Sequence, residues 1–436
     1  MIPSHLYIRQ LTAWSLSLGA FSWAYSFEAA AEPVSITRTG AVDVAFRNSR
    51  ELAIAELEVA RAKVELRWSG RLDNPELEMN LSDDGAGLND NEGIFEVAFS
   101  QRFPITSRLK DEKRLRGYQV VLAEAEIAEQ RRELAGQVDL AAVELMATRA
   151  VSERQQKLSA LNQKIVAFLA EQVAQGQASN LDLTQAKLTG RSIDQTIQAL
   201  AALENTRQLE LKQLMGISPE QPIRLTSELV LPGNQPDKRL ATESLFRMRP
   251  DFILAVSRID EAEAAIALEK SKRWADVAVK VFGEQERAVD EPTGLERNSF
   301  LGVGISIPLP IRQRNQVGIE KSLIDREAAE RSVDAIRFHI RSEYEEAFQH
   351  RLANWKLASE ASGDVLSLAE GNFAEFQKAY QQGQASLLQV QRAQEQQLEL
   401  ETAAIQSIAN YYRSDAQLRF VTGAYPILRT AVNSGK

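Results

Sequence analysis

The five residues Gln175-Gly176-Gln177-Ala178-Ser179 recur unchanged as Gln382-Gly383-Gln384-Ala385-Ser386, 207 positions further along the chain. The similarity extends to both sides of this pentapeptide. Matches at nearly the same spacing are Leu181 with Leu388, Leu183 with Val390, Ala186 with Ala393, and Phe103-Pro104-Ile105 with Leu309-Pro310-Ile311. A constant spacing between matched segments is typical of an internal duplication. The chain is therefore predicted to contain two copies of one unit.

Long helices are predicted in both copies. No proline occurs from Arg108 to Ala174 or from Gln316 to Gln381. At 1.5 Å per residue, a helix over the first stretch would be roughly 100 Å long. Apolar residues follow the three- and four-residue steps of a coiled coil, at Leu158, Leu161, Ile165 and Phe168 and at Leu366, Ala369, Phe373, Phe376 and Tyr380. Each copy thus predicts a long helical hairpin with the pentapeptide at its tip, where Gly176 and Gly383 suit a helix end that needs a positive φ.

Four short segments alternate apolar and polar residues with period two, which predicts half-buried strands. Each is also about as long as a tilted strand that crosses a bilayer. Polar loops are expected between the strands of each pair, at Ser82–Gly93 and Gly283–Ser299. Ordinary amphipathic hairpins packed on the helices remain an alternative, but the far end of a long rod offers little core for packing. Four strands are too few to close a barrel, so several copies would have to share one.

The N-terminal segment has the order of a secretory signal, with Arg9, then the apolar Leu11–Phe27, then the small residues Ala29-Ala30-Ala31. Cleavage is expected after Ala31, and a transmembrane anchor is the alternative. The predicted division of the chain is a signal peptide at 1–31, a first repeat at 32–216 (strands about 75–83 and 94–103, helical hairpin 108–215), a linker at 217–242, a second repeat at 243–424 (strands about 276–283 and 299–308, helical hairpin 316–422) and a tail at 425–436.

Composition excludes several classes of function. The 436 residues carry a formal net charge of −9, whereas a protein that coats nucleic acid needs a clustered basic excess. The absence of Cys removes disulfides, thiolate metal sites and thiol nucleophiles. Only three His are present, so a His-based metal site or catalytic triad has little to draw on. We expect no enzyme, no cofactor and no resident metal.

Three further motifs accompany the duplication: Asn74-Pro75-Glu76-Leu77 before the first strand, Arg249-Pro250-Asp251 at the start of the second repeat, and Pro308-Leu309-Pro310-Ile311-Arg312-Gln313-Arg314-Asn315-Gln316 after the last strand. With them, residues 40–424 resemble the TolC-like outer-membrane factor family, and in particular its CzcC-like, heavy-metal branch. The sequence departs from that branch in having no N-terminal Cys to carry a lipid and in placing Val317 before Gly318.

The resemblance implies a mainly α protein with a small β part. Three copies would form an α-barrel tunnel in the periplasm and a shared twelve-stranded barrel in the outer membrane. Such a homotrimer contacts outer-membrane lipid and works with a periplasmic adaptor and an inner-membrane resistance-nodulation-division pump, with no nucleic acid involved. The implied function is an exit duct that passively conducts heavy-metal cations to the cell exterior. Alternatives are a duct for organic drugs or secreted proteins, a soluble periplasmic coiled-coil scaffold, and the adaptor itself, which has one hairpin rather than a duplication.

Candidate site residues fall in three groups. One group is expected to dock the adaptor, with mere reversal of the chain as the alternative: the tip residues Gly176, Gln177, Ala178, Ser179, Gly383, Gln384, Ala385 and Ser386. Asp182 would form a ring of three carboxylates in a trimer and act as a cation gate, or is an ordinary acidic residue at a helix start. Glu76, Glu78, Glu96 and Lys280 are expected to face the lumen, with solvent-facing strand residues as the alternative.

Overall fold

A computed structural model gives the fold and describes residues 33–83, 92–235, 239–290, 292 and 294–425. The predicted signal peptide and residues 426–436 lie outside this range. In chain order the elements are β1 (Val34–Ile36), α1 (Arg38–Asn48), α2 (Arg50–Trp68), β2 (Glu76–Ser82), β3 (Gly93–Phe103), α3 (Arg108–Ala174), α4 (Asn180–Leu214), β4 (Ile223–Leu225), α5 (Thr242–Met248), α6 (Pro250–Ser271), β5 (Val277–Asp290), β6 (Gly294–Ser306), α7 (Gln316–Ala361), α8 (Asp364–Gln381) and α9 (Leu387–Thr422). The expected mainly α fold with a small β part is confirmed.

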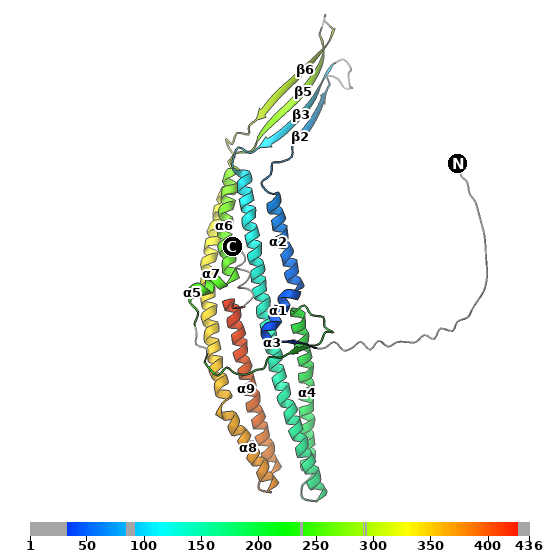
Figure 1. Cartoon of the computed structure of the whole chain (residues 1–436), viewed down its shortest axis with the longest axis vertical. Coiled ribbons are helices and arrows are strands. Elements are labelled where there is room, and N and C mark those ends of the chain that lie inside the picture. The colour runs from blue at the N-terminus through cyan, green and yellow to red at the C-terminus, as the bar shows by residue number, and fades with distance from the viewer. Residues whose placement is uncertain (1–32, 84–91, 236–238, 291, 293, 426–436) are drawn as a thin grey trace, which may run out of the picture.

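Two helical hairpins form a long rod, and a sheet projects from one of its ends (Figure 1). The first hairpin is α3 with α4, and the second is α7 and α8 with α9. In the half of the rod nearer the sheet, α2 packs beside α3, and α6 packs against both α3 and α7. The tips of the two hairpins lie at the opposite end of the rod. The duplication thus places two similar turns at one end and all four long strands at the other.

The predicted coiled-coil positions pack the hairpins together near their tips. Phe373 is 6% exposed and lies in a cluster with Leu161, Phe376 and Tyr380. Ile165 and Leu169 form a second cluster with Leu183 and Leu387, which come from opposite repeats. Alternating steps of three and four residues keep apolar side chains on one helix face, so each hairpin buries that face against its neighbour.

The four long strands form one antiparallel sheet in the order β2-β3-β5-β6. The central β3–β5 pairing joins the two repeats, from Gly93 opposite Arg287 to Phe103 opposite Val277. One face is mostly apolar, and its exposed apolar side chains are Leu77, Met79, Leu81, Phe95, Phe99, Val281, Leu301, Val303 and Ile305. Because no described element of the chain covers it, this face is built to meet lipid or another apolar surface.

The second pair of strands is longer than expected. β5 runs to Asp290 and β6 begins at Gly294, so most of the predicted loop Gly283–Ser299 is paired strand. Residues 284–287 are polar on both faces of the sheet, so the apolar alternation that predicted the strand ends before them. The backbone ladder nevertheless continues to Asp290 opposite Gly294, because strand pairing depends on main-chain groups.

The second hairpin also differs from the expected uninterrupted helix 316–381. α7 ends at Ala361 and α8 begins at Asp364. The Ser362 hydroxyl donates to the Ala358 carbonyl over 2.6 Å, and Gly363 adopts a non-helical ψ of −135°. A serine that bonds back to the preceding turn, followed by a glycine without a Cβ, favours a break here.

Near the middle of the rod, β1 and β4 form a short parallel pair that the sequence did not predict. Their buried Ile36, Ile223 and Leu225 lie in one core cluster with residues of α1, α3 and α4, including Val42, Val138 and Leu211. Strands of three residues carry too little periodicity for sequence analysis to detect. Their pairing ties the segment before α1 to the linker after α4.

Candidate functional site

The two tip turns have the same backbone geometry. Gly176 and Gly383 both have φ +73°, and the amides of Gly176 and Gly383 donate to carbonyls of Val173 and Tyr380 over 3.0 Å. The next amide in each turn donates five residues back over 2.8 Å, which completes the Schellman pattern of a helix end. A Cβ at either glycine would meet no atom within 4 Å. The glycines are therefore required by the backbone conformation, while the space around them stays open.

The residues that follow the glycines start the returning helices. The Ser179 hydroxyl accepts from the Leu181 amide over 3.1 Å, and Ser386 forms a capping box with Gln389. Gln177, Ser179, Gln384 and Ser386 are exposed, and Ala178 and Ala385 are half-buried. Sequence analysis used Leu181 and Leu388 only to align the two repeats and did not predict them as site residues; they are 76% and 56% exposed. Each tip thus presents a leucine beside polar side chains, in two nearly equivalent copies.

Asp182 lies in the first turn of α4. Burial, and then the negative charge of Asp182, raise the pKa of Tyr380 in α8. The Tyr380 ring also packs edge-on against Phe168 of α3, with a centroid distance of 6.1 Å. The carboxylate is thus close to the seam between the two hairpins of one chain.

Lys280 brings two of the predicted strand residues together on the polar face of the sheet. Its ammonium lies 2.6 Å from a Glu96 oxygen and 3.3 Å from a Glu78 oxygen. The Asn80 amide donates to the same Glu96 oxygen over 3.4 Å. Two carboxylates therefore share one cation, so this patch is less acidic than its glutamates alone suggest.

Glu76 pairs with a different cation, since its carboxylate lies 3.3 Å from the Arg102 guanidinium. The extended β5 adds Glu284 and Glu286 to the polar face, opposite Glu96 and Ile94 on β3. Sequence analysis missed both glutamates because they fell in the predicted loop. The signal that could have found them is their even-numbered spacing from Lys280.

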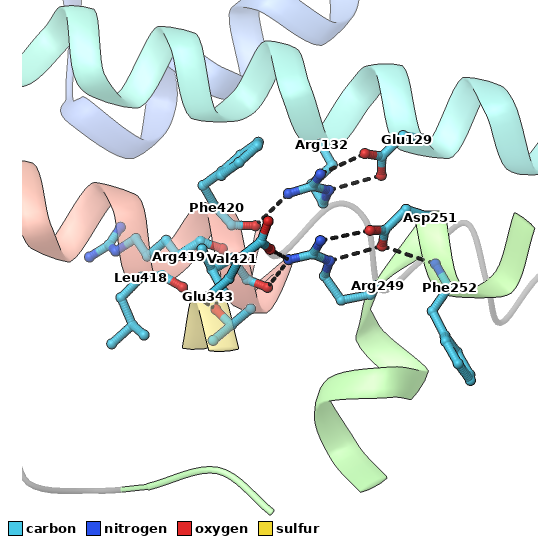
Figure 2. Close-up of polar contacts among 11 residues, drawn as sticks. Glu129, Arg132, Arg249, Asp251, Phe252, Glu343, Leu418, Arg419, Phe420 and Val421 are labelled. Atoms are coloured by element: carbon cyan, nitrogen blue, oxygen red, sulfur yellow. Dashed lines mark hydrogen bonds and ion pairs between the residues drawn. The ribbon is translucent and has the colours of Figure 1, made fainter. Parts of the chain in front are cut away.

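The Arg249-Pro250-Asp251 motif builds a junction between the repeats (Figure 2). Arg249, 3% exposed, donates to the Val421 carbonyl over 2.8 Å and to Glu343 over 3.0 Å, and it also pairs with Asp251. Beside it, Arg132 donates to the Phe420 carbonyl over 2.9 Å. Two arginines thus cap the carbonyls at the C-terminal end of α9. Through these contacts the motif positions α6 against α9.

Within the described residues, no three His, Asp or Glu side chains are grouped closely enough to hold a metal ion. Over the same part of the chain, no helix carries an apolar run long enough to cross a membrane.

Comparison with solved structures decides the fold. The chain superposes on CusC with a TM-score of 0.70 and 17% identity, covering 88% of this chain and 92% of CusC. The outer-membrane protein VceC of Vibrio cholerae gives 0.65 and 18% identity over 88% of this chain and 96% of VceC. The open-state MtrE outer-membrane channel of Neisseria gonorrhoeae gives 0.69 and 15% over 88% of each chain. The chain has the fold of the TolC-like outer-membrane efflux channels.

Sequence comparison also finds a relative of the chain. The cobalt-zinc-cadmium resistance protein CzcC of Cupriavidus metallidurans is 23% identical over 286 residues. The match spans 64% of this chain and 64% of CzcC, just under two thirds of that relative. No family model matches the chain. The resemblance drawn from the tip repeat and the three motifs is thus confirmed by both comparisons.

Proposed function

We propose that the protein is the outer-membrane exit duct of a tripartite efflux system and conducts heavy-metal cations passively to the cell exterior. The observation that carries this proposal is the sheet with one exposed apolar face at the end of a duplicated helical rod. The solved structures of CusC and of the MtrE outer-membrane channel superpose on 88% of the chain. Heavy metals as the cargo are supported by the similarity to CzcC, a cobalt-zinc-cadmium resistance protein.

The assembly that this function needs is a homotrimer. Each chain supplies four strands, β2 and β6 are the open edges of its sheet, and twelve strands suffice for a closed membrane barrel. The exposed apolar face would then contact outer-membrane lipid. The polar face, with Glu76, Glu78, Glu96 and Lys280, would line the lumen.

The opposite end of the rod would meet the other components. We place the adaptor at the two tips, Gly176–Ser179 and Gly383–Ser386, with Leu181 and Leu388 as its apolar contacts. Asp182 would contribute a ring of three carboxylates close to this entrance, where acidic side chains favour cations. The inner-membrane pump would supply both the energy and most of the substrate selectivity, so the duct needs no catalytic group.

Membrane location and oligomeric state test the duct itself. The outer-membrane fraction is extracted in mild detergent, and the molecular mass is measured by light scattering with correction for bound detergent. A trimer found only with the membrane fraction is expected. A monomer released by osmotic shock would contradict the duct and indicate a soluble periplasmic scaffold instead.

The cargo is tested separately by deleting the gene and measuring growth with graded cobalt, zinc, cadmium, copper or silver. Lower metal tolerance, restored by the wild-type gene, is expected. Unchanged metal tolerance with new sensitivity to dyes or antibiotics would assign the duct to organic compounds.

Adaptor docking is tested with Leu181→Ser and Leu388→Ser in one chain. Both side chains are exposed, so the trimer should form normally while crosslinking to the adaptor and metal tolerance are lost. Leu203→Ser, at a position 42% exposed on the same α4 but away from the tip, is the matched control. Equal crosslinking in both variants would contradict docking at the tips.

A further inference from the structure

The segment that follows β6 exposes three aliphatic side chains and two arginines. Ile307, Leu309 and Ile311 are 53%, 66% and 71% exposed, and Arg312 and Arg314 are exposed as well. Isolated exposed aliphatics need no explanation, but three at alternate positions beside two cations form a small amphipathic surface. We call this surface, Ile307–Arg314, the collar segment.

Hydrogen bonds hold the collar segment in a defined shape. The Arg314 Nε donates to the Pro310 carbonyl over 2.9 Å, and the side-chain amide of Gln316 donates to the Arg312 carbonyl over 3.2 Å. At its end, Asn315 has φ 56° and donates to the backbone carbonyl of Glu269 over 2.9 Å. An ordered loop that leaves its aliphatics in solvent is preorganised for a partner.

The strand order decides what lies beside the collar segment in a closed barrel. The sheet edges are β2 and β6, and β6 ends at the helical end of the sheet, where β2 begins. Pairing β6 with β2 of the next copy is antiparallel, like the other pairings. It places the collar segment next to the residues that precede β2 in that copy, including Arg71.

All three arginines at this boundary lack an acidic partner in the described residues. Arg71 lies over the Trp68 ring at 4.0 Å, and no described carboxylate lies within salt-bridge distance of Arg71, Arg312 or Arg314. The nearby acids are engaged within their own chain, because Asp73 lies 3.8 Å from Arg108 and Glu76 lies 3.3 Å from Arg102. Cations from two copies would repel each other unless an anion lies between them.

We propose that each subunit boundary binds one anionic phospholipid, its phosphate between Arg312 and Arg314 of one copy and Arg71 of the next, its acyl chains over Ile307, Leu309 and Ile311. The inference rests on the proposed trimeric duct. It commits to a lipid rather than free phosphate because the three exposed aliphatics follow directly in the chain after the exposed Val303 and Ile305 of β6. Basic residues at a membrane surface select anionic headgroups.

Native mass spectrometry of the detergent-extracted full chain tests this site. The protein is titrated with phosphatidylglycerol and, in parallel, with phosphatidylethanolamine of the same acyl chains. We expect up to one tightly bound phosphatidylglycerol per subunit and weaker binding of phosphatidylethanolamine. Arg312→Gln with Arg314→Gln, and separately Arg71→Gln, should lower phosphatidylglycerol affinity roughly fivefold per arginine. Arg191→Gln, an exposed arginine of α4 without a described acidic partner, should not.

The outcomes separate this inference from the proposed function. A trimer that binds both lipids equally, or variants that bind phosphatidylglycerol as the wild type does, overturns the lipid site and leaves the duct intact. Arginine variants that dissociate the trimer in lipid-free detergent, with lipid binding unchanged, would make the collar segment a contact between copies instead. A monomer in detergent would overturn the duct and the lipid site together.

Discussion

The guanidinium of Arg249 donates a 2.8 Å hydrogen bond to the backbone carbonyl of Val421, 172 residues away. Arg249 immediately precedes α6, and Val421 lies in the last turn of α9, so the bond joins the beginning and the end of the second repeat. Arg132 of α3 caps the adjacent Phe420 carbonyl, which extends the junction to the first repeat. The junction thereby fixes where α9 stops against α3 and α6.

Replacing Arg249 with Met should destabilise the fold strongly. Removing one member of a buried ion pair leaves its partners uncompensated, here Asp251 and the Val421 carbonyl, at a cost of about 3 kcal/mol in the free energy of unfolding. Chemical denaturation followed by circular dichroism measures this loss. Arg331→Met is the control, because Arg331 pairs with Glu327 in solvent at 79% side-chain exposure. An equal loss in both variants would contradict a special role of the junction.

Asp251 should contribute stability that depends on pH. Burial alone would raise its pKa, but the hydrogen bonds and charge of Arg249 outweigh burial and hold the pKa below its ordinary value of 3.8. The unfolded chain therefore binds the proton more readily. The contribution is fully present above pH 3.8 and is lost as the pH falls through the lower pKa of the folded state.

The measurement compares the unfolding free energy of wild type and Asp251→Asn from about pH 6 to about pH 3. The wild type should be more stable by a constant amount at the upper end, and the difference should narrow at the acidic end. A difference that stays constant over the whole range would show that Asp251 acts through packing alone.

Replacing glycine with alanine should lower the free energy of unfolding at the tips and raise it inside a helix. Gly176→Ala or Gly383→Ala should cost about 1 kcal/mol, because φ +73° is strained for any residue with a Cβ. Gly371→Ala, inside α8 where a Cβ meets no atom within 4 Å, should instead stabilise by up to about 1 kcal/mol. Thermal unfolding measures both effects. Destabilisation at all three positions would contradict this distinction.

If the protein is the proposed duct, Lys280→Gln should make its pore more selective for cations. In the wild type one ammonium neutralises part of the charge on Glu78 and Glu96, and its removal leaves both carboxylates uncompensated on the polar face. Reversal potentials in planar bilayers with a salt gradient measure the change. Lys110→Gln, an exposed position on α3 outside the sheet, is the control. A pore with unchanged selectivity would mean that the polar face does not line the conduction path.

Much of the architecture was predictable because it depends on local sequence patterns. The repeated pentapeptide located both turns, and Gly176 and Gly383 adopt the positive φ that their position after a long helix required. The alternation of Leu77, Met79 and Leu81 with polar residues predicted a one-sided strand, and those three side chains are all exposed on one face. Helix and strand periods depend on neighbouring residues, so sequence carries them directly.

Other features were not predictable, since they depend on partners distant in the chain. Residues 284–287 of β5 are polar on both faces and are held by pairing with β3 and β6. The pairing of Lys280 with both Glu78 and Glu96 depends on the β3–β5 register, which no spacing within one strand reveals.

By itself, the sequence determined the duplication, the long helices, the tips and the residues of the one-sided strands. It did so because turn chemistry and hydrophobic periodicity are properties of contiguous residues. Only the tertiary structure decided which carboxylates share Lys280, that Arg249 and Arg132 cap α9, and that the collar segment and Arg71 lie at the same end of the sheet. These relationships join residues from 172 to 288 positions apart, and they form only when helices and strands from both repeats pack together.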